Sequence, residues 1–228
     1  MLENILAYER DLFLLLNGSH TAFLDGVAWL YSGRMVWIPL VTFLLAVLIY
    51  KVKWQQWAPV LLGFAVVVLL CDQFSSHICK PLFTRLRPTH HPDFMEQVHT
   101  VFGYRGGKYG FISGHSANAF GVATFFALLF RTPLLTVTVY VWATLMAYSR
   151  IYLGVHFISD VVPGVLSGIF FGYLSYILYV HCCSKYNNKE VKRGGYSVRR
   201  CRYMAVAVLS TMLTVILFSP WLVTLTVP

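Results

Sequence analysis

Long apolar segments constrain what this chain can fold into more than any other feature of its sequence. A helix that crosses the hydrocarbon core of a bilayer needs about 20 mostly apolar residues. Six segments approach that length, at 27–50, 57–79, 113–130, 133–148, 157–181 and 204–227. Charged residues make up 12% of the chain, against about 25% in soluble domains. The sequence therefore predicts an all-α integral membrane protein built as a six-helix bundle.

The first 26 residues form an amphipathic pattern instead of a span. Leucine and phenylalanine alternate there with Glu9, Arg10 and Asp11, which is typical of a helix that lies flat at a membrane surface. No polar stretch is long enough to fold as a second domain. We therefore expect one domain over residues 1–228, with an interfacial helix at 1–26, an outer loop at 80–112 and a basic cytoplasmic loop at 184–203.

The distribution of basic residues predicts the orientation of the spans. A net charge of +9 could indicate nucleic-acid binding, but seven of the 18 basic residues lie in the loop at 184–203. Such loops stay in the cytoplasm, and because spans alternate, the segments around Lys51 and Arg131 should lie there too. The loop at 80–112 then faces the opposite side, and no nucleic-acid partner is expected.

A short basic stretch, KPLFTRLRP, follows the second apolar segment. It contains Lys80 and, seven positions later, Arg87. Arginine offers a planar fork of donors that suits phosphate oxygens, and lysine offers a compact point charge. The alternative is a pair of basic side chains that extend from a helix end toward the lipid headgroups. Taken alone, the stretch favours this alternative.

A second stretch, FISGHSANAF, begins the third apolar segment. If a helix starts there, Ser113 and Gly114 lie where free backbone N–H groups and the helix dipole favour a bound phosphate. His115 would then point toward the bound group from the first turn. The alternative is a serine N-cap followed by a histidine that faces solvent.

The third stretch, YSRIYLGVHFISD, places Arg150, His156 and Asp160 between two apolar segments. The histidine and the aspartate are four residues apart, so they share one face if a helix has begun. A carboxylate beside an imidazole fixes its tautomer and raises its basicity. A structural ion pair is the alternative, but two buried charged groups cost more than an apolar pair.

All three stretches fall at the outer ends of predicted spans, so we expect them to form one pocket. Three cations and a helix N-terminus would bind a phosphate dianion. Two histidines, one of them next to an aspartate, would provide a nucleophile and an acid. The residues therefore predict phosphoryl transfer through a covalent phospho-histidine.

These stretches resemble the three motifs of the type 2 phosphatidic acid phosphatase family, which includes bacterial lipid phosphate phosphatases and shares its site with vanadium haloperoxidases. The motifs here are Lys80…Arg87-Pro88, Ser113-Gly114-His115 and Ser149-Arg150…His156…Asp160. They cover residues 80–160, and their order and spacing match the family. One departure is Ile112, where the family usually has a proline, so a rigid turn is lost but no reacting group.

The resemblance implies a role for each motif residue. His156 attacks phosphorus and is oriented by Asp160, while His115 protonates the leaving oxygen and then activates water. The implied phosphate-binding residues are Lys80, Arg87, Ser113, Gly114 and Arg150. This set requires no metal and no other cofactor.

Other polar residues allow two interpretations. The outer loop contains five that could bind a metal, but they lack paired ligand spacing, and a solvated loop or a lid over the headgroup is preferred: His90, His91, Asp93, Glu96 and His99. Asp72 shares a helix face with Ser76 and Lys80, so it either supports the site or bonds to another helix.

A stripe of glycines continues from the third motif in steps of four: Gly164, Gly168 and Gly172. Small residues in such a stripe allow two helices to approach closely. We therefore expect close helix packing, and we hypothesise that it also holds the helix next to the nucleophile in place.

The sequence thus predicts a metal-independent lipid phosphatase in the bacterial inner membrane, with its site facing the periplasm. Undecaprenyl pyrophosphate and lipid A phosphate are the expected substrates, with phosphatidylglycerol phosphate and phosphatidic acid as further candidates. The alternative is a transporter or lipid flippase, which would distribute charges through the depth of the bundle. A haem electron carrier would need histidines that face each other in pairs. The candidate histidines His77, His115 and His156 are all expected near one face, with no second layer opposite them.

Overall fold

The computed structural model describes residues 2–185 and 196–226. Within these ranges the regular elements are helices, and the only strand-like pairing is an isolated antiparallel bridge between Leu86 and Tyr109. The all-α class expected from the sequence is therefore confirmed.

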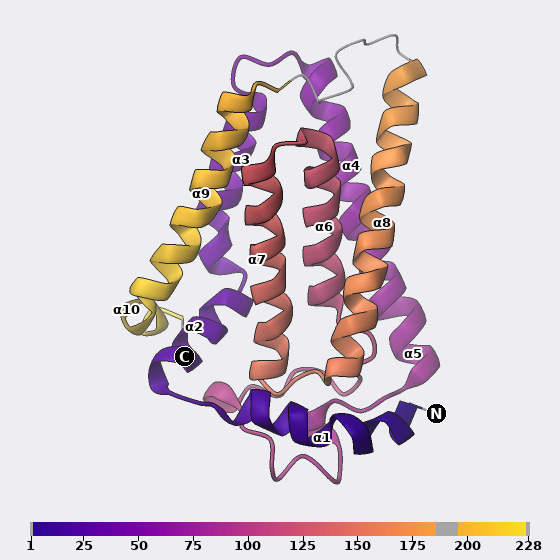
Figure 1. Ribbon diagram of the computed structural model, residues 1–228, viewed down its shortest axis with the longest axis vertical. Coiled ribbons are helices and arrows are strands. Elements are labelled where there is room, and N and C mark those ends of the chain that lie inside the picture. The colour runs from indigo at the N-terminus through magenta and orange to yellow at the C-terminus, as the bar shows by residue number, and fades with distance from the viewer. Residues whose placement is uncertain (1, 186–195, 227–228) are drawn as a thin grey trace.

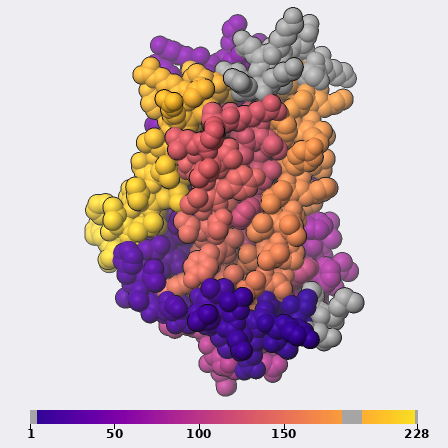
Figure 2. Space-filling model, in the orientation of Figure 1, coloured from indigo at the N-terminus to yellow at the C-terminus, as the bar shows by residue number. Residues whose placement is uncertain are grey.

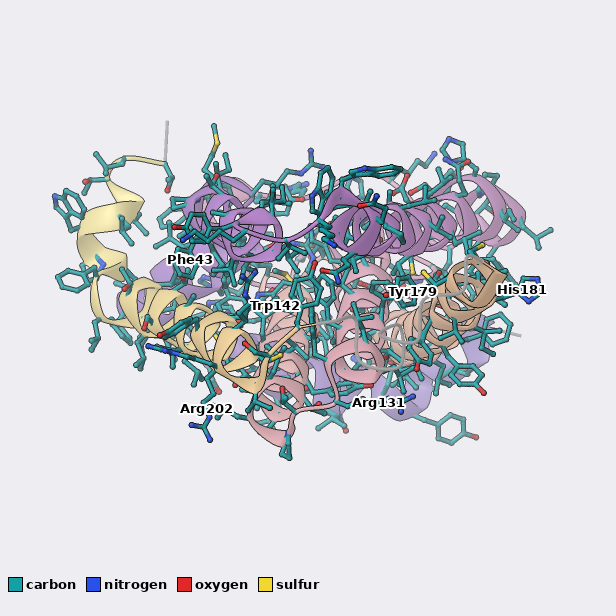
Figure 3. All side chains as sticks on the ribbon, turned by 90° about the horizontal axis from the view of Figure 1, so that it is seen from above. Phe43, Arg131, Trp142, Tyr179, His181 and Arg202 are labelled. Atoms are coloured by element: carbon teal, nitrogen blue, oxygen red, sulfur yellow. The ribbon has the colours of Figure 1, made fainter. Side chains whose placement is uncertain are left out.

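Most helices run side by side along the long axis of the molecule (Figure 1). They are α3 (Ile38–Ile49), α4 (Trp54–Asp72), α6 (Gly114–Phe130), α7 (Pro133–Tyr152), α8 (Ile158–Lys185) and α9 (Val198–Leu217). Seen end-on, α3 and α4 form one layer and the other four helices form a second, with Trp142 between the two layers (Figure 3).

The helices give fewer candidate membrane spans than the apolar segments of the sequence do. Four helices of the described chain are long and apolar enough to cross a bilayer, at Trp54–Phe83, Pro133–Tyr152, Ile158–Cys183 and Val198–Leu217. A bent pair of helices raises this number to five, and α6 is a shorter apolar helix of 17 residues. The expected count of six spans is therefore not confirmed.

Several helices begin at residues that favour a helix N-terminus. Thr21, Ser113 and Ser197 each accept a hydrogen bond from a backbone N–H group in the first turn of a helix. Such N-caps contribute about 0.5–2 kcal/mol each. Pro133 occupies the first turn of α7, where its missing N–H group costs nothing. These caps fix where the apolar segments begin to coil.

The apolar segment at 27–50, expected to be a spanning helix, is not one unbroken helix. The segment is divided into α2 (Ala22–Ser32), the short helix η1 (Met35–Trp37) and α3, with a bend of 68° between the two parts. Gly33 ends α2 in an extended conformation. The bend brings the segment Ser32–Gly33–Arg34 to the wall of the main cavity.

Two other boundaries differ from the expected ones. The second span continues from α4 through the wide turn η2 (Gln73–Cys79) and α5 (Lys80–Phe83), so Lys80 lies on a helix rather than in the outer loop. At the C-terminus, α9 already begins at Val198, inside the expected basic loop, and α10 (Ser219–Val223) follows it. Residues 186–195 of that loop lie outside the described residues.

Helix α1 (Leu2–Gly18) crosses one end of the bundle, below α7 and α8 (Figures 1 and 2). Its buried residues recur every three or four positions: Leu6, Glu9, Phe13 and Asn17. Its other face exposes Tyr8, Leu12 and Leu15, as expected of a helix at a membrane surface. The expected range of 1–26 is too long, because residues 22–26 belong to α2.

Helices α6 and α8 approach each other closely along the glycine stripe. A Cβ atom added at Gly168 would meet the carbonyl oxygen of Ala117, and one at Gly172 would meet the carbonyl oxygen of Gly121. The expected close packing is therefore confirmed. Because α6 begins at Gly114, next to His115, and α8 begins at Ile158, two residues after His156, this packing also sets the distance between the two histidine segments.

Replacing Gly168 by leucine should separate α6 from α8. Overpacking typically costs about 1–3 kcal/mol, so we expect Gly168→Leu to lower the melting temperature and phosphatase activity together. The matched control is Val162→Leu, which enlarges a half-exposed side chain on the same helix. A Gly168→Leu protein that melts like the control and keeps full activity would contradict this role.

Candidate active site

The three sequence motifs converge at the end of the bundle that α1 covers. They line one cavity of about 580 Å³, which contains residues from all three stretches: Lys80, Arg87, Gly114, His115 and His156. The rest of this cavity is formed mainly by apolar side chains of α3, α4, α6 and α7. It therefore joins a charged pocket to an apolar groove.

His156 lies in the turn between α7 and α8, not in the helix itself. Gly154 forms this turn with φ of 68°, a left-handed conformation that glycine adopts without steric cost. The imidazole is 1% exposed. Its Nδ1 atom lies 3.6 Å from Oδ2 of Asp160, close enough for electrostatic attraction but longer than a hydrogen bond.

Asp160 is held mainly by Arg85, a residue that the sequence analysis missed. The Nη1 atom of Arg85 donates to Oδ1 of Asp160 at 2.7 Å and to Oγ of Ser159 at 2.7 Å. Its Nη2 atom donates to Oε1 of Glu9 at 3.0 Å. Glu9 also accepts from the backbone N–H group of Ser159 at 2.8 Å. This buried network joins α1, the outer loop and α8.

Lys80 and Arg87 lie where the first motif predicts cations. The Nζ atom of Lys80 donates to Oγ of Ser76 at 3.4 Å. Arg87 is buried and is fixed by the carbonyl oxygens of Tyr109 at 3.1 Å and Val155 at 3.3 Å. Bonds to neutral carbonyl groups leave the charge of the guanidinium available to an anion in the cavity.

Arg150 is 2% exposed and lines a smaller cavity of about 210 Å³. Its guanidinium donates to the hydroxyl groups of Ser32 and Tyr104. His115 and the segment Ser32–Gly33–Arg34 line both the smaller and the larger cavity. Tyr104 and Arg34 do not belong to the sequence motifs. Both lie far along the chain from Arg150, with which they line the smaller cavity.

The start of α6 is organised as an N-cap. The Oγ atom of Ser113 accepts from the Ser116 backbone N–H group, and the Ser113 N–H group donates to the carbonyl oxygen of Asp160 at 3.0 Å. The Ser113 amide is therefore already engaged, contrary to the expectation that it faces a phosphoryl group. Gly114 and His115 do line the main cavity.

The cations dominate the electrostatics of the site. Burial, followed by the charges of Arg87, Arg150 and Lys80, holds the pKa of His156 well below its usual 6.5. Burial and Arg150 lower the pKa of Arg87 to about 10, so this guanidinium stays charged at neutral pH. His156 is thus a neutral imidazole surrounded by positive charge, which is the state required of a nucleophile.

Asp72 occupies the main cavity instead of bonding to another helix. Its Oδ1 atom accepts from Oγ of Ser76 at 3.4 Å, and Ser76 in turn accepts from Lys80. The three residues form a ladder along one helix face that includes the π-type turn η2, a feature often found at functional sites. Asp72 therefore supports the position of Lys80.

One cluster in the described part of the chain could bind a metal ion: His20, Asp25 and His99. It includes one of the five loop residues considered above. The rings of His20 and His99 are stacked with their centroids 3.5 Å apart, and they would have to separate to coordinate a common ion. The cluster lies outside both cavities.

Removing the positive charge of Arg85 should destabilise the fold. Arg85→Met would leave the carboxylates of Glu9 and Asp160 buried without their shared partner. Breaking a buried ion pair costs about 3–5 kcal/mol, so we expect a large loss of melting temperature and of activity. The control is Arg105→Met, in the same loop but exposed. Equal melting temperatures for the two variants would contradict the network's role.

The depressed pKa of His156 predicts a stability change with pH. The unfolded chain binds the proton near pH 6.5, whereas the folded protein does not. The free energy of unfolding should therefore fall as the pH drops below about 6.5. Melting temperatures at pH 8, 6.5 and 5 should decrease more for the natural protein than for His156→Gln. A His156 ring signal that titrates at pH 6.5 by NMR would contradict this.

Comparisons with known proteins agree with the geometry. The profile of the PAP2 superfamily matches residues 56–182, which include all three motifs. Lipid A 4'-phosphatase of Porphyromonas gingivalis is 44% identical over 81% of this chain and 78% of its own length. Lipid A 4'-phosphatase of Bacteroides thetaiotaomicron is 30% identical over 96% of this chain and 98% of its own length.

A solved structure supports the same assignment. The crystal structure of LpxE from Aquifex aeolicus superposes with a TM-score of 0.53 at 28% identity, over 74% of this chain and 94% of that chain. The family match covers more than half of the chain, and the apolar helices are those of a membrane protein. We conclude that the chain is a membrane lipid phosphatase and belongs to the PAP2 superfamily.

Proposed function

We propose that this protein removes a phosphate from lipid A through a phospho-histidine formed on His156. The observation that carries the proposal is the cavity of about 580 Å³, which is charged at one end and apolar along the rest. A lipid phosphate has the same division, because its phosphate is anionic and its acyl chains are apolar. The relatives of this chain that act on lipid A favour that lipid over undecaprenyl pyrophosphate.

The first half-reaction uses both histidines. The Nδ1 atom of His156 faces Asp160, so Nε2 is the attacking atom. A bond forms between Nε2 and phosphorus, the bond from phosphorus to the leaving oxygen breaks, and His115 donates a proton to that oxygen. The products are the dephosphorylated lipid and phospho-His156.

The second half-reaction releases phosphate. Water gives a proton to His115 while its oxygen attacks phosphorus, and the bond between phosphorus and His156 breaks. Lys80, Arg87 and Arg150 stabilise the charge on the phosphoryl oxygens in both steps, together with the amide of Gly114. Because these groups supply the positive charge, we expect the reaction to need no metal ion and no cofactor.

The surrounding fold supports six spans in one domain over residues 1–228. The bent pair of α2 and α3 would be the first span, and α6 the short central one. The basic residues Lys51, Arg131 and Arg202 lie in or beside the connections at the end opposite the site, where the guanidinium of Arg131 donates to the hydroxyl group of Tyr176 and Arg202 is exposed. Basic residues favour the cytoplasm, so the site would face the periplasm from the bacterial inner membrane.

The proposal can be tested by phosphate release from purified protein in detergent with EDTA present. The lipid panel is lipid A, undecaprenyl pyrophosphate, phosphatidylglycerol phosphate and phosphatidic acid. We expect lipid A to be the best substrate and His156→Ala to lose activity by about 10⁴-fold or more. His115→Ala should lose about 10²–10⁴-fold, as expected for an acid–base group.

The matched control is His181→Ala, on the same helix α8 but at the opposite end of the bundle (Figure 3). It should keep the natural activity. Full activity in His156→Ala would exclude this histidine as the nucleophile. If a folded natural protein released no phosphate from any lipid, a transporter or flippase function would replace the proposal.

A further inference from the structure

The smaller cavity, here called the chamber, adjoins the reacting site and shares His115 and the segment Ser32–Gly33–Arg34 with the larger one. It has a volume of about 210 Å³ and is lined by Trp29, Arg34, Tyr104, His115 and Arg150, among others. His115 lines both cavities, whereas His156 lines the larger one. The chamber is therefore reached from the phosphoryl site past His115.

This position identifies what the chamber receives. In phosphoryl transfer the attacking and leaving atoms lie roughly in line, on opposite sides of phosphorus. His156 provides the attacking atom, and His115 provides the proton for the leaving oxygen. The leaving group must therefore lie on the His115 side, where the smaller cavity meets the apolar groove of the larger one, so that its head can enter the former while its acyl chains occupy the latter.

Arg34 gives the chamber a hydrogen-bonding group that the protein itself does not use. Its side chain is exposed, and within residues 2–185 and 196–226 no acidic or hydrogen-bonding partner holds its guanidinium. Burial raises the pKa of Tyr104, but the charges of Arg150, Arg87 and Arg34 outweigh burial and lower it overall. Arg34 and Tyr104 line the same cavity as His115, the residue proposed to protonate the leaving oxygen.

Aromatic rings form another wall of the chamber. Trp29 packs edge-on against Tyr104 and Phe102, with ring centroids 5.7 Å and 5.6 Å apart. Trp and Tyr present an apolar ring with one polar group, which suits a ligand that has both C–H faces and hydroxyl groups. The volume is below the roughly 300–1,000 Å³ of pockets for drug-sized ligands, so it suits one small ring.

We propose that the chamber formed by Trp29, Arg34 and Tyr104 binds the sugar ring of the leaving group. The inference rests on the proposed function, because it assumes that His115 protonates the leaving oxygen. A sugar ring presents hydroxyl oxygens to Arg34 and Tyr104 and C–H groups to Trp29. A diacylglycerol or polyprenyl phosphate leaving group lacks the ring that Trp29 would contact, so the chamber selects lipids whose phosphate is attached to a sugar.

The test compares lipids that share the phosphate and differ in the leaving group. Values of kcat/KM are measured on lipid A, phosphatidic acid and undecaprenyl pyrophosphate for the natural protein, Trp29→Leu and Arg34→Gln. Loss of one hydrogen bond to a charged group costs about 1.5–3 kcal/mol. We therefore expect the ratio of kcat/KM for lipid A to that for phosphatidic acid to fall about 10–100-fold in Arg34→Gln.

Trp29→Leu should lower the same ratio mainly through KM. Arg202→Gln and Trp54→Leu are the matched controls, because both side chains lie at the other end of the molecule and are far from the chamber. They should leave the ratio unchanged. Arg34 is exposed, so its variant should fold even if Trp29→Leu does not.

Two outcomes would overturn the inference. Equal losses on all three lipids would mean that Arg34 and Trp29 act on the phosphoryl group and not on the leaving group. A selective loss on undecaprenyl pyrophosphate would mean that Arg34 binds a second phosphate. Both outcomes differ from failure of the proposed function, in which the natural protein itself releases no phosphate from any lipid.

As a second measurement, dephosphorylated lipid A is added as a product inhibitor while phosphatidic acid is the substrate. The sugar of this product should occupy the chamber without any chemical step. We expect its inhibition constant to rise about tenfold or more in Arg34→Gln. An unchanged inhibition constant in both variants would contradict sugar binding.

Discussion

The buried contact between Arg85, Asp160 and Glu9 is the interaction on which the rest of the site depends. Arg85 comes from the loop that also carries Arg87, Asp160 begins α8 beside His156, and Glu9 belongs to α1. Buried carboxylates are costly unless they are paired and hydrogen-bonded. One guanidinium therefore holds three separate segments together, and it fixes the turn that carries His156 against α1.

The site depends equally on the close approach of α6 and α8. Glycines let the two backbones come close, and the hydrogen bond from the Ser113 N–H group to the Asp160 carbonyl oxygen joins the helix starts. His115 lies in the first turn of α6, and His156 lies two residues before the start of α8, so this joint positions both histidines. With His156 neutral among buried cations, a phosphate dianion would neutralise the charge that the fold concentrates there, so substrate binding and charge compensation are one event.

Local patterns in the sequence were sufficient for the helices and for the motif residues, because apolar length, capping residues and spacing are properties of neighbouring positions. The break at Gly33 was missed because the polar tripeptide Ser32–Gly33–Arg34 is short and lies between two apolar stretches whose combined length fits one span. Arg85, Arg34 and Tyr104 were missed for a different reason. Their partners are Asp160 and Glu9, or the residues around Arg150, and these contacts between distant segments appear only in three dimensions.

The central claim is that His156 carries the phosphoryl group during the reaction. His115→Ala is mixed with lipid A labelled in its phosphate and quenched rapidly without acid. This variant should trap the intermediate, because the loss of His115 should slow hydrolysis of the phospho-histidine more than its formation. Peptide mass spectrometry should then find the label on His156. Label on another residue would contradict the account. So would phosphate release that continues at the same rate without His156 and never labels the protein.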